Sequence, residues 1–373
     1  MIRVLHIVNC MNRGGLETFI MNVYRNIDRS KVQFDFLVHV DKEGAFDKEI
    51  KTLGGKIFFV PPRNQGILKN RKILNKFFKV HPEYKIVHQH VSSLSYIEPL
   101  KVAKIHRVPI RIVHAHSTQQ GGNSLHKYIH LWNRIFINSY ATHYFACSNS
   151  AARWLFGKKM FENGEYKIIN NGIEISKYRY NPVKRIEVRK ALGINNKFVL
   201  GHVGRFSYVK NHAFLIDLFK HICEISSDFV MLLVGDGELR ENIETKIASY
   251  GLKNSVIITG IRNDVPDLLQ AMDIFIFPSN YEGLPVALVE AQASGLPCLV
   301  SDNITRQVKI TNNIEFIDLS SPISYWVSKI NEIKRNYKRQ DQSKQVIDKG
   351  FDIKKTAQHL QELYQKLYRD SKG

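Results

Sequence analysis

Short apolar runs alternate with segments of helical length along the whole chain, and this alternation limits the possible folds more than any other feature. The short runs predict strands, and the longer segments between them predict helices. The expected strands lie near residues 2–8, 33–39, 56–60, 85–89, 110–114, 143–147, 166–169, 198–203, 229–234, 255–259, 273–277 and 297–300. Such alternation is typical of parallel sheets with helices on both faces. The sequence therefore predicts an α/β protein with doubly wound sheets.

The chain has 373 residues, which favours two domains over one. The apolar rhythm stops in NNGIEISKYRYNPVKR, residues 170–185, where turn-forming and charged residues take over. We therefore expect Rossmann-like domains over residues 1–175 and 176–350. Residues 351–373 are expected to form a last helix that packs back on the first domain. Ligands bind beyond the carboxyl ends of parallel strands, so the two domains would face a central cleft.

The chain is strongly basic, with 54 Lys and Arg against 34 Asp and Glu and a formal net charge of +20. Such a charge attracts polyanions. Nucleic acid is not an expected partner, because the sequence has no Arg-Gly-rich run, no zinc-ligand spacing and no RNA-binding motif. Phosphorylated substrates and anionic membranes remain as candidates.

Four scattered cysteines favour a reducing compartment. The start, MIRVLHIVNC, lacks the apolar core of a signal peptide, and no apolar run approaches the length of a membrane span. These features predict a cytoplasmic location.

Two glutamates, Glu282 and Glu290, lie in PSNYEGLPVALVEAQASGLP around the start of an expected helix over residues 285–295. Free N–H groups and the helix dipole make a helix N-terminus a site for anions such as a diphosphate. Because carboxylates would repel phosphate, we expect them to accept hydrogen bonds from ribose or hexose hydroxyls. The alternative is a solvated loop acid and a surface helix acid.

Two further loops join an expected strand to a helix. NCMNRGGLETF supplies Gly14 and Gly15, which let a ligand approach the backbone or merely form a tight turn. It is not the G-x-G-x-x-G dinucleotide motif. LGHVGRFSYVKNH supplies Gly204, Arg205 and Lys210. The two cations would hold a diphosphate, unless they are simply solvated.

Acidic residues also follow strands in HVDKEG and VGDGE, but neither is an Asp-x-Asp triplet that would hold a catalytic metal. Turn and helix-start roles are expected for these residues, namely Asp41, Glu43, Asp236 and Glu238. Ser148 in ACSNSA follows a strand as a nucleophile would, but the glycines of a nucleophile elbow are missing. A helix-capping role is favoured for Ser148.

Histidines end two expected strands, in VHQHV (His88 and His90) and in VHAHST (His114 and His116). Alternation places each pair on one face of its strand. A metal site would need ligands that the sequence does not identify, so no metal is predicted. A catalytic or acceptor contact is the functional hypothesis, and ordinary strand-end histidines are the alternative.

Seven stretches together resemble the retaining GT-B glycosyltransferases of family four over nearly the whole chain, in particular EpsF-like bacterial exopolysaccharide enzymes. The stretches are NRGGLETF, VHAHST, ACSNSA, NNGI, GRFSYVKNH, LLVGDGE and PSNYEGLPVALVEAQASGLP. The resemblance implies metal-independent, retaining transfer of a hexose, without a cofactor, from a nucleoside diphosphate sugar, expected to be UDP-linked. The acceptor would be a lipid-linked oligosaccharide. The alternative is a catalytically silent partner that binds sugar nucleotides.

The resemblance also implies residue roles. Glu290 would bind the ribose, Glu282 a donor hexose hydroxyl, and Arg205 with Lys210 the diphosphate. The implied catalytic residues are His116, Arg205, Lys210 and Glu282. The implied donor site adds Gly14, Gly15, Gly204, Gly283, Leu284 and Glu290. The implied acceptor-binding residues are His90, His114 and Ser148.

GILKNRKILNKFFKVHPEY, residues 66–84, predicts a basic amphipathic helix. One stripe would contain Lys69, Lys72, Lys76 and Lys79. A neighbouring apolar face would contain Ile67, Leu74, Phe77 and Phe78. The hypothesis is peripheral binding to the anionic inner face of a membrane, and the alternative is an ordinary surface helix.

Overall fold

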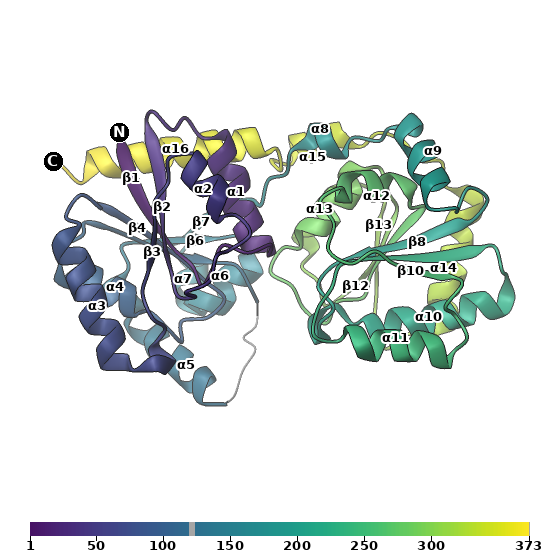
Figure 1. The fold of residues 1–373 in the computed structure, drawn as a ribbon, viewed down its shortest axis with the longest axis horizontal. Coiled ribbons are helices and arrows are strands. Elements are labelled where there is room, and N and C mark those ends of the chain that lie inside the picture. The colour runs from purple at the N-terminus through teal and green to yellow at the C-terminus, as the bar shows by residue number, and fades with distance from the viewer. Residues whose placement is uncertain (119–123, 373) are drawn as a thin grey trace. The chain divides into compact units, whose positions relative to one another are not determined.

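A computed structural model describes residues 1–118 and 124–372 (Figure 1). The chain forms two compact units: unit 1 contains Met1–Gly172 and Ile353–Gly373, and unit 2 contains Ile173–Asp352. Each unit is built on one sheet whose paired strands are parallel. Helices cover both faces of each sheet. The predicted fold class, two doubly wound Rossmann-like α/β domains, is confirmed.

The sheet of unit 1 has the strand order β3-β2-β1-β4-β5-β6-β7. Its central strands β2 and β4 are buried on both faces, so polar residues within them, such as Asp35 and His88, are buried as well. The strands are β1 (Ile2–Ile7), β2 (Val32–Val38), β3 (Ile57–Phe59), β4 (Ile86–Val91), β5 (Ile110–Ala115), β6 (His143–Ala146) and β7 (Lys167–Ile168).

The helices of unit 1 are α1 (Gly15–Asn26), α2 (Asp47–Thr52), α3 (Ile67–Val80), α4 (Glu98–Ile105), α5 (Ser124–Tyr140), α6 (Asn149–Phe156), α7 (Lys158–Glu162) and α16 (Ile353–Asp370). Figure 1 shows α1, α2 and α16 on one side of the sheet and α3, α4 and α5 on the other. Helix α16 packs beside α1, and its residues Ala357, Leu360 and Tyr364 belong to the apolar core of unit 1. The last helix therefore completes the unit that the first residues begin.

The sheet of unit 2 has the strand order β10-β9-β8-β11-β12-β13. Its strands are β8 (Phe198–Val203), β9 (Phe229–Val234), β10 (Val256–Ile258), β11 (Ile274–Phe277), β12 (Cys298–Ser301) and β13 (Ile314–Ile317). The sequence did not predict β13. This edge strand is short and includes the half-buried Glu315, so it lacks the apolar character of its neighbours.

Helices cover both faces of this second sheet, and each face has its own apolar core. The helices are α8 (Ile175–Tyr178), α9 (Pro182–Ala191), α10 (His212–Ile225), α11 (Arg240–Ser249), α12 (Val265–Ala271), α13 (Val286–Ala293), α14 (Ile323–Asn336) and α15 (Ser343–Asp348). Trp326 of α14 is fully buried in one core, and Met272 is fully buried in the other.

Strand order reverses once in each sheet, between β1 and β4 in unit 1 and between β8 and β11 in unit 2. The connections on either side of such a point leave the sheet in opposite directions, so the carboxyl ends of the two strands border a crevice. Each sheet therefore presents one edge where loops can hold a ligand.

Candidate functional site

The loops that follow β8 and β11 contact each other at the carboxyl edge of the second sheet. The backbone N–H of Asn280 donates to the carbonyl of Val209 at 2.8 Å, and its side-chain amide donates to the carbonyl of Tyr208 at 2.8 Å. These contacts fix the loop that contains Lys210 against the loop that contains Glu282. Two of the predicted site residues are thereby brought together.

Lys210 and Glu282 form an ion pair with 2.6 Å between Nζ and Oε1. Their side chains are 16% and 19% exposed, and Nζ also lies 4.6 Å from the centre of the Phe277 ring. An ammonium group has three N–H donors, so contact with one carboxylate leaves donors for a second anion. The pair therefore provides a positioned cation and a positioned hydrogen-bond acceptor at the same place.

Arg205 has a different environment. Its side chain is 73% exposed, and Nε donates to Glu238 Oε2 at 3.0 Å. An exposed pair of this kind is worth at most about 1 kcal/mol, so the guanidinium can turn toward a ligand at little cost. Glu238 was expected to serve only in a turn or helix start, and its contact with Arg205 was missed. Asp236 has the predicted turn role, since Oδ1 accepts from the N–H of Gly237.

Gly204 lies where the loops after β8 and β9 cross. A Cβ at Gly204 would be 3.1 Å from Cε of Lys210, and a Cβ at Gly235 would be 2.0 Å from the carbonyl oxygen of Gly204. Gly235 also has φ of +140°, a conformation that favours glycine. The two glycines therefore let the loops approach closely enough to seat the stem of Lys210.

Glu290 lies in the second turn of α13, whose N-cap is Pro285. The hydroxyl of Tyr178 donates to Glu290 Oε1 at 2.6 Å, while burial raises the pKa of Glu290 and the Tyr178 contact opposes that rise. Tyr178 was not predicted, because it comes from the four-residue helix α8 within the expected domain joint. Gly283 and Leu284 are buried in the loop before α13.

The first glycine loop begins α1, with Gly14 as the N-cap in extended conformation. A Cβ at Gly14 would lie 2.2 Å from Oε2 of Glu17, whereas a Cβ at Gly15 would meet nothing within 4 Å. Burial raises the pKa of the Glu17 carboxyl. A side chain at Gly14 would displace only the end of the Glu17 side chain, and ligand approach at Gly14 and Gly15 stays a prediction.

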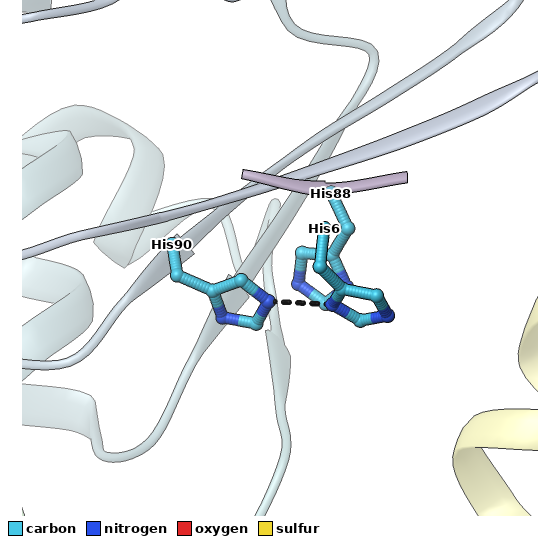
Figure 2. Close-up of side chains that lie close together, drawn as sticks. All are labelled: His6, His88 and His90. Atoms are coloured by element: carbon cyan, nitrogen blue, oxygen red, sulfur yellow. Dashed lines mark hydrogen bonds between the residues drawn. The ribbon is translucent and has the colours of Figure 1, made fainter. Parts of the chain in front are cut away.

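Five histidines gather on one face of the first sheet, and we call them the histidine cluster: His6, His88, His90, His114 and His116. Parallel pairing aligns His6 with His88 and His90 with His114. Figure 2 shows His6, His88 and His90 close together, with the first and last joined by a hydrogen bond of 2.9 Å. His6 was missed by sequence reasoning, although its place in an alternating strand was a usable signal.

The cluster contains two separate hydrogen-bonded chains. In one, His90 Nε2 contacts His6 Nδ1 and His90 Nδ1 contacts His116 Nε2 at 3.0 Å. In the other, His88 contacts Tyr364 Oη at 2.6 Å and His114 Nδ1 at 3.1 Å. Burial lowers the pKa of all five rings, to about 3 for His6 and His116, so the rings are neutral at physiological pH.

The acceptor-binding roles predicted for His90, His114 and Ser148 remain predictions. The structure buries all three side chains. Both ring nitrogens of His90 contact other histidines. Ser148 is the N-cap of α6, where its Oγ accepts from the N–H of Ala151 at 3.1 Å, so the favoured capping role is confirmed.

Two overlapping groups of three histidines bring one ring nitrogen each within 4.8 Å of one another, namely His6, His88 and His90, and His90, His114 and His116. Three histidines are a plausible zinc ligand set. The ring-to-ring hydrogen bonds account for the same proximity with protons in place of a metal.

Comparison with known proteins identifies both halves of the chain. Residues 13–177 match the family model "Glycosyltransferase Family 4", and residues 184–349 match "Glycosyl transferases group 1". The "Putative glycosyltransferase EpsF" of Bacillus subtilis is 40% identical over 334 residues, which cover 88% of this chain and 86% of the relative. The "Capsular polysaccharide biosynthesis glycosyltransferase CapH" of Staphylococcus aureus is 29% identical and covers 98% of this chain and 99% of its own.

A third relative is the "UDP-Gal:alpha-D-GlcNAc-diphosphoundecaprenol alpha-1,3-galactosyltransferase" of Escherichia coli, 29% identical over 83% of each chain. Among solved structures, Anabaena HepE in complex with UDP-glucose superimposes with a TM-score of 0.78 at 19% identity, covering 98% of this chain and 100% of that one. WaaG, from lipopolysaccharide biosynthesis, superimposes with a TM-score of 0.68 at 16% identity, covering 99% of this chain and 98% of that one. Given both family matches and the full-length relatives, this chain belongs to the GT-B glycosyltransferases that join a Glycosyltransferase Family 4 domain to a group 1 domain.

Proposed function

We propose that this glycosyltransferase moves a hexose from a UDP-linked donor to a lipid-linked oligosaccharide during exopolysaccharide or capsule synthesis. The observation that supports it most is the Lys210–Glu282 pair at the carboxyl edge of β8 and β11. A cation for phosphate and an acceptor for a sugar hydroxyl are both needed for a nucleotide sugar. The name of CapH supports a role in polysaccharide synthesis, and the name of the Escherichia coli galactosyltransferase supports a diphosphate-lipid acceptor.

In this proposal each side of the donor has its own partners. Arg205, Lys210 and the N-terminus of α13 neutralise the diphosphate, and Glu290 accepts hydrogen bonds from the ribose. Glu282 accepts from a hydroxyl of the hexose. The remaining predicted donor residues, Gly14, Gly15, Gly204, Gly283 and Leu284, shape the loops around the ligand.

The proposed reaction is a substitution with retention on the front face of the sugar. The bond from the anomeric carbon to the phosphate oxygen breaks, and the electron pair leaves with UDP. The acceptor oxygen bonds to the anomeric carbon on the same face, and its proton passes to the departing phosphate. Arg205 and Lys210 stabilise the charge that develops on this leaving group. His116 would contact the transferred hexose.

Purified protein incubated with a panel of UDP-hexoses should release UDP slowly without acceptor and faster with a lipid-linked acceptor extract. Arg205→Ala should lower turnover about 10²-fold, as the loss of a charge contact in the transition state does. A change confined to KM would contradict this role. UDP binding without UDP release from any donor, with or without acceptor, would instead favour the catalytically silent partner.

Metal independence is part of the same proposal, because side-chain cations and a helix N-terminus supply the positive charge around the diphosphate. Turnover should therefore persist in EDTA. Activity that is lost in EDTA and restored by Mn²⁺ or Mg²⁺ would overturn the metal-free mechanism while leaving the transferase assignment in place.

We also propose that unit 1 binds an anionic membrane at the cytoplasmic face. Lys69, Lys72, Lys76 and Lys79 of α3 are all exposed. The apolar face was partly mispredicted: Leu74, Phe77 and Phe78 are buried, but Ile67 is exposed because it lies in the first turn, beyond the packed part of the helix. None of the helices within residues 1–118 and 124–372 combines the length and apolar character needed to cross a bilayer.

Helix α5, on the same side of the sheet, supports this surface (Figure 1). Its residues Leu125, Tyr128, Trp132 and Ile135 are exposed at spacings of three and four, which places them along one face of the helix. Exposed aromatic and aliphatic side chains suit the interface of a bilayer, and the α3 lysines suit an anionic one.

The membrane proposal is tested by sedimentation with vesicles that contain an anionic phospholipid. Replacing Lys69, Lys72, Lys76 and Lys79 by Gln should abolish co-sedimentation and spare UDP binding, since each cation near the surface contributes about 1 kcal/mol. The control removes the same charge from four exposed lysines of unit 2, Lys190, Lys253, Lys309 and Lys349. Equal loss in both variants would show non-specific attraction, and unchanged sedimentation of the α3 variant would refute the proposal.

A further inference from the structure

We propose that His6 and His90 are positioning residues that hold His116 in a single tautomer, with the proton on Nδ1 and the lone pair on Nε2. This inference rests on the proposed function only where it assigns His116 a task in transfer. Its structural basis is the chain of hydrogen bonds from His6 through His90 to His116.

The chain fixes the protons because a neutral imidazole has only one N–H. Each ring-to-ring hydrogen bond needs one proton between its two nitrogens. His90 uses both nitrogens, one toward His6 and the other toward His116. All three rings must therefore donate in the same direction, either from His6 toward His116 or the reverse.

The environment of His6, at the buried end of this chain of hydrogen bonds, selects the direction in which the rings donate. His6 is almost fully buried, and its Nε2 has no hydrogen-bond partner among the described residues. If the chain ran inward from His116, this nitrogen would have a buried N–H without an acceptor, and such orphaned donors are rare in native proteins. If the chain runs outward, the same nitrogen holds only a lone pair. The outward direction is therefore favoured.

The outward direction defines what His116 offers to a ligand. Nε2 of His116 accepts from Nδ1 of His90, so it is not available as a base. Nδ1 then has the proton, and the ring is half-buried where β5 ends. His116 is thereby a neutral hydrogen-bond donor toward the hexose, not a proton acceptor. This agrees with a reaction in which the departing phosphate takes the acceptor proton.

The second chain of the cluster serves as an internal control. His88 contacts His114 and Tyr364 through its two nitrogens, and neither of these two hydrogen bonds involves His116. It lies on the same face of the sheet and is equally buried. A disturbance of this chain should affect stability without changing the tautomer of His116.

The test is ¹⁵N NMR of histidine-labelled full-length protein, in which protonated and unprotonated ring nitrogens have distinct shifts. In the unaltered protein, His116 should show an unprotonated Nε2 and a protonated Nδ1. His6→Phe should produce a mixture of both tautomers, and His6→Asn, which keeps a donor near the Nδ1 position, should restore one. Tyr364→Phe should leave His116 unchanged. A protonated Nε2 in the unaltered protein would overturn the proposal, even if no variant folds.

Kinetic measurements test the role of His116 in transfer separately from its tautomer. His6→Phe should lower kcat about tenfold with little change in the donor KM, equivalent to one lost hydrogen bond, and His6→Asn should recover most of it. If His6→Phe changed the tautomer without changing kcat, the proposed role of His116 in transfer would be refuted, but the tautomer assignment would still hold. Stoichiometric zinc bound to His90 and His116 would refute the assignment itself, because a metal would replace the proton between them.

Discussion

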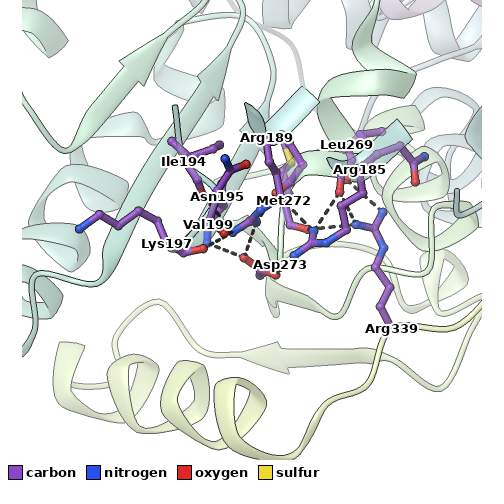
Figure 3. Close-up of polar contacts among 12 residues, drawn as sticks. Arg185, Arg189, Ile194, Asn195, Lys197, Val199, Leu269, Met272, Asp273 and Arg339 are labelled. Atoms are coloured by element: carbon purple, nitrogen blue, oxygen red, sulfur yellow. Dashed lines mark hydrogen bonds and ion pairs between the residues drawn. The ribbon is translucent and has the colours of Figure 1, made fainter. Parts of the chain in front are cut away.

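Unit 1 and unit 2 each bury a cluster of basic side chains against their sheet, but the two clusters differ in charge and in partners. The rings of the histidine cluster are neutral and contact mainly one another. In unit 2, which Figure 3 shows, Arg185 and Arg189 both pair with Asp273. Arg339 donates to the carbonyls of Leu269, Gln270, Met272 and Ser294. We call these four charged residues the arginine cluster.

The clusters also lie at opposite edges of their sheets. Asp273 immediately precedes β11 and accepts from the N–H of Val199 at 2.7 Å, so the arginine cluster is at the amino edge. His116 follows β5 and is therefore at the carboxyl edge, where parallel sheets bind ligands. Burial of basic groups therefore does not by itself indicate a functional site. The arginine cluster joins α9 and α12 to the sheet, whereas the histidine cluster ends at the carboxyl edge.

The largest expected difference between the two units is the loss of stability at acidic pH. Burial lowers the pKa of His6, His88, His90 and His114 below the free value of 6.5, so the unfolded chain binds more protons just below that pH. Their contribution to stability is complete above about pH 6.5 and is lost as pH falls. Each histidine contributes about 1.4 kcal/mol per pH unit.

Unit 2 has two buried histidines with lowered pKa, His202 and His212. Burial also lowers the pKa of four further histidines of unit 1, namely His39, His116, His130 and His143. Unit 1 should therefore lose stability several times as steeply as unit 2 between pH 6 and pH 5 and should open first. Hydrogen exchange with mass spectrometry, which reports peptides of each unit separately, measures this. Equal slopes, or earlier opening of unit 2, would contradict the contrast between neutral and charged clusters.

Arg189→Met should destabilise unit 2 by about 3 kcal/mol, because it leaves the half-buried carboxylate of Asp273 and several carbonyls with fewer donors. UDP affinity of the folded protein should not change, since the arginine cluster lies at the edge away from the donor residues. Arg262→Met is the matched control: its pair with Asp264 is exposed and should cost less than about 1 kcal/mol. Urea unfolding and calorimetry with UDP measure both effects. Weaker UDP binding in Arg189→Met would contradict a purely structural role.

Lys210→Met, at the carboxyl edge of the same unit, should affect function more than stability, the opposite of Arg189→Met. We expect turnover to fall about 10²-fold, because the positioned ammonium stabilises the leaving diphosphate. Lys246→Met on α11, which breaks a pair of equal length with Asp217 of α10, should leave turnover near its original value. Steady-state kinetics with the preferred UDP-sugar measure the turnover of both variants. Similar losses in the two variants would show that the effect is not specific to the Lys210–Glu282 pair.

The smallest expected effects concern Glu290. Glu290→Gln should weaken UDP binding about tenfold, since the amide loses charge-assisted acceptance from the ribose. Tyr178→Phe should weaken it less, because it removes only the hydroxyl that orients Oε1. Calorimetry with UDP measures both variants. An unchanged affinity in Glu290→Gln would remove Glu290 from the nucleotide site.

The fold and most site loops could be predicted because they depend on local pattern: apolar runs, helix starts, and glycines after strands. The contacts of Glu290 with Tyr178 and of Arg205 with Glu238 could not, because they join residues that are distant in the sequence. The same holds for His6, whose partner His90 is 84 positions away. The arginine cluster was missed for a further reason: in so basic a chain, arginines on helix patterns are expected on the surface.

The path of the chain has a consequence for the order in which the units fold during synthesis. The chain leaves unit 1 at Gly172 and returns to it at Ile353, and at this junction Ile173 forms a parallel bridge with Asp352. The ribosome therefore releases every residue of unit 2 before α16, which supplies Leu360, Leu363 and Tyr364 to the core of unit 1. Unit 2 can complete its core first, while the core of unit 1 awaits α16. Tyr364, whose hydroxyl contacts His88, lies on α16. The core of the N-terminal unit is therefore completed after that of unit 2.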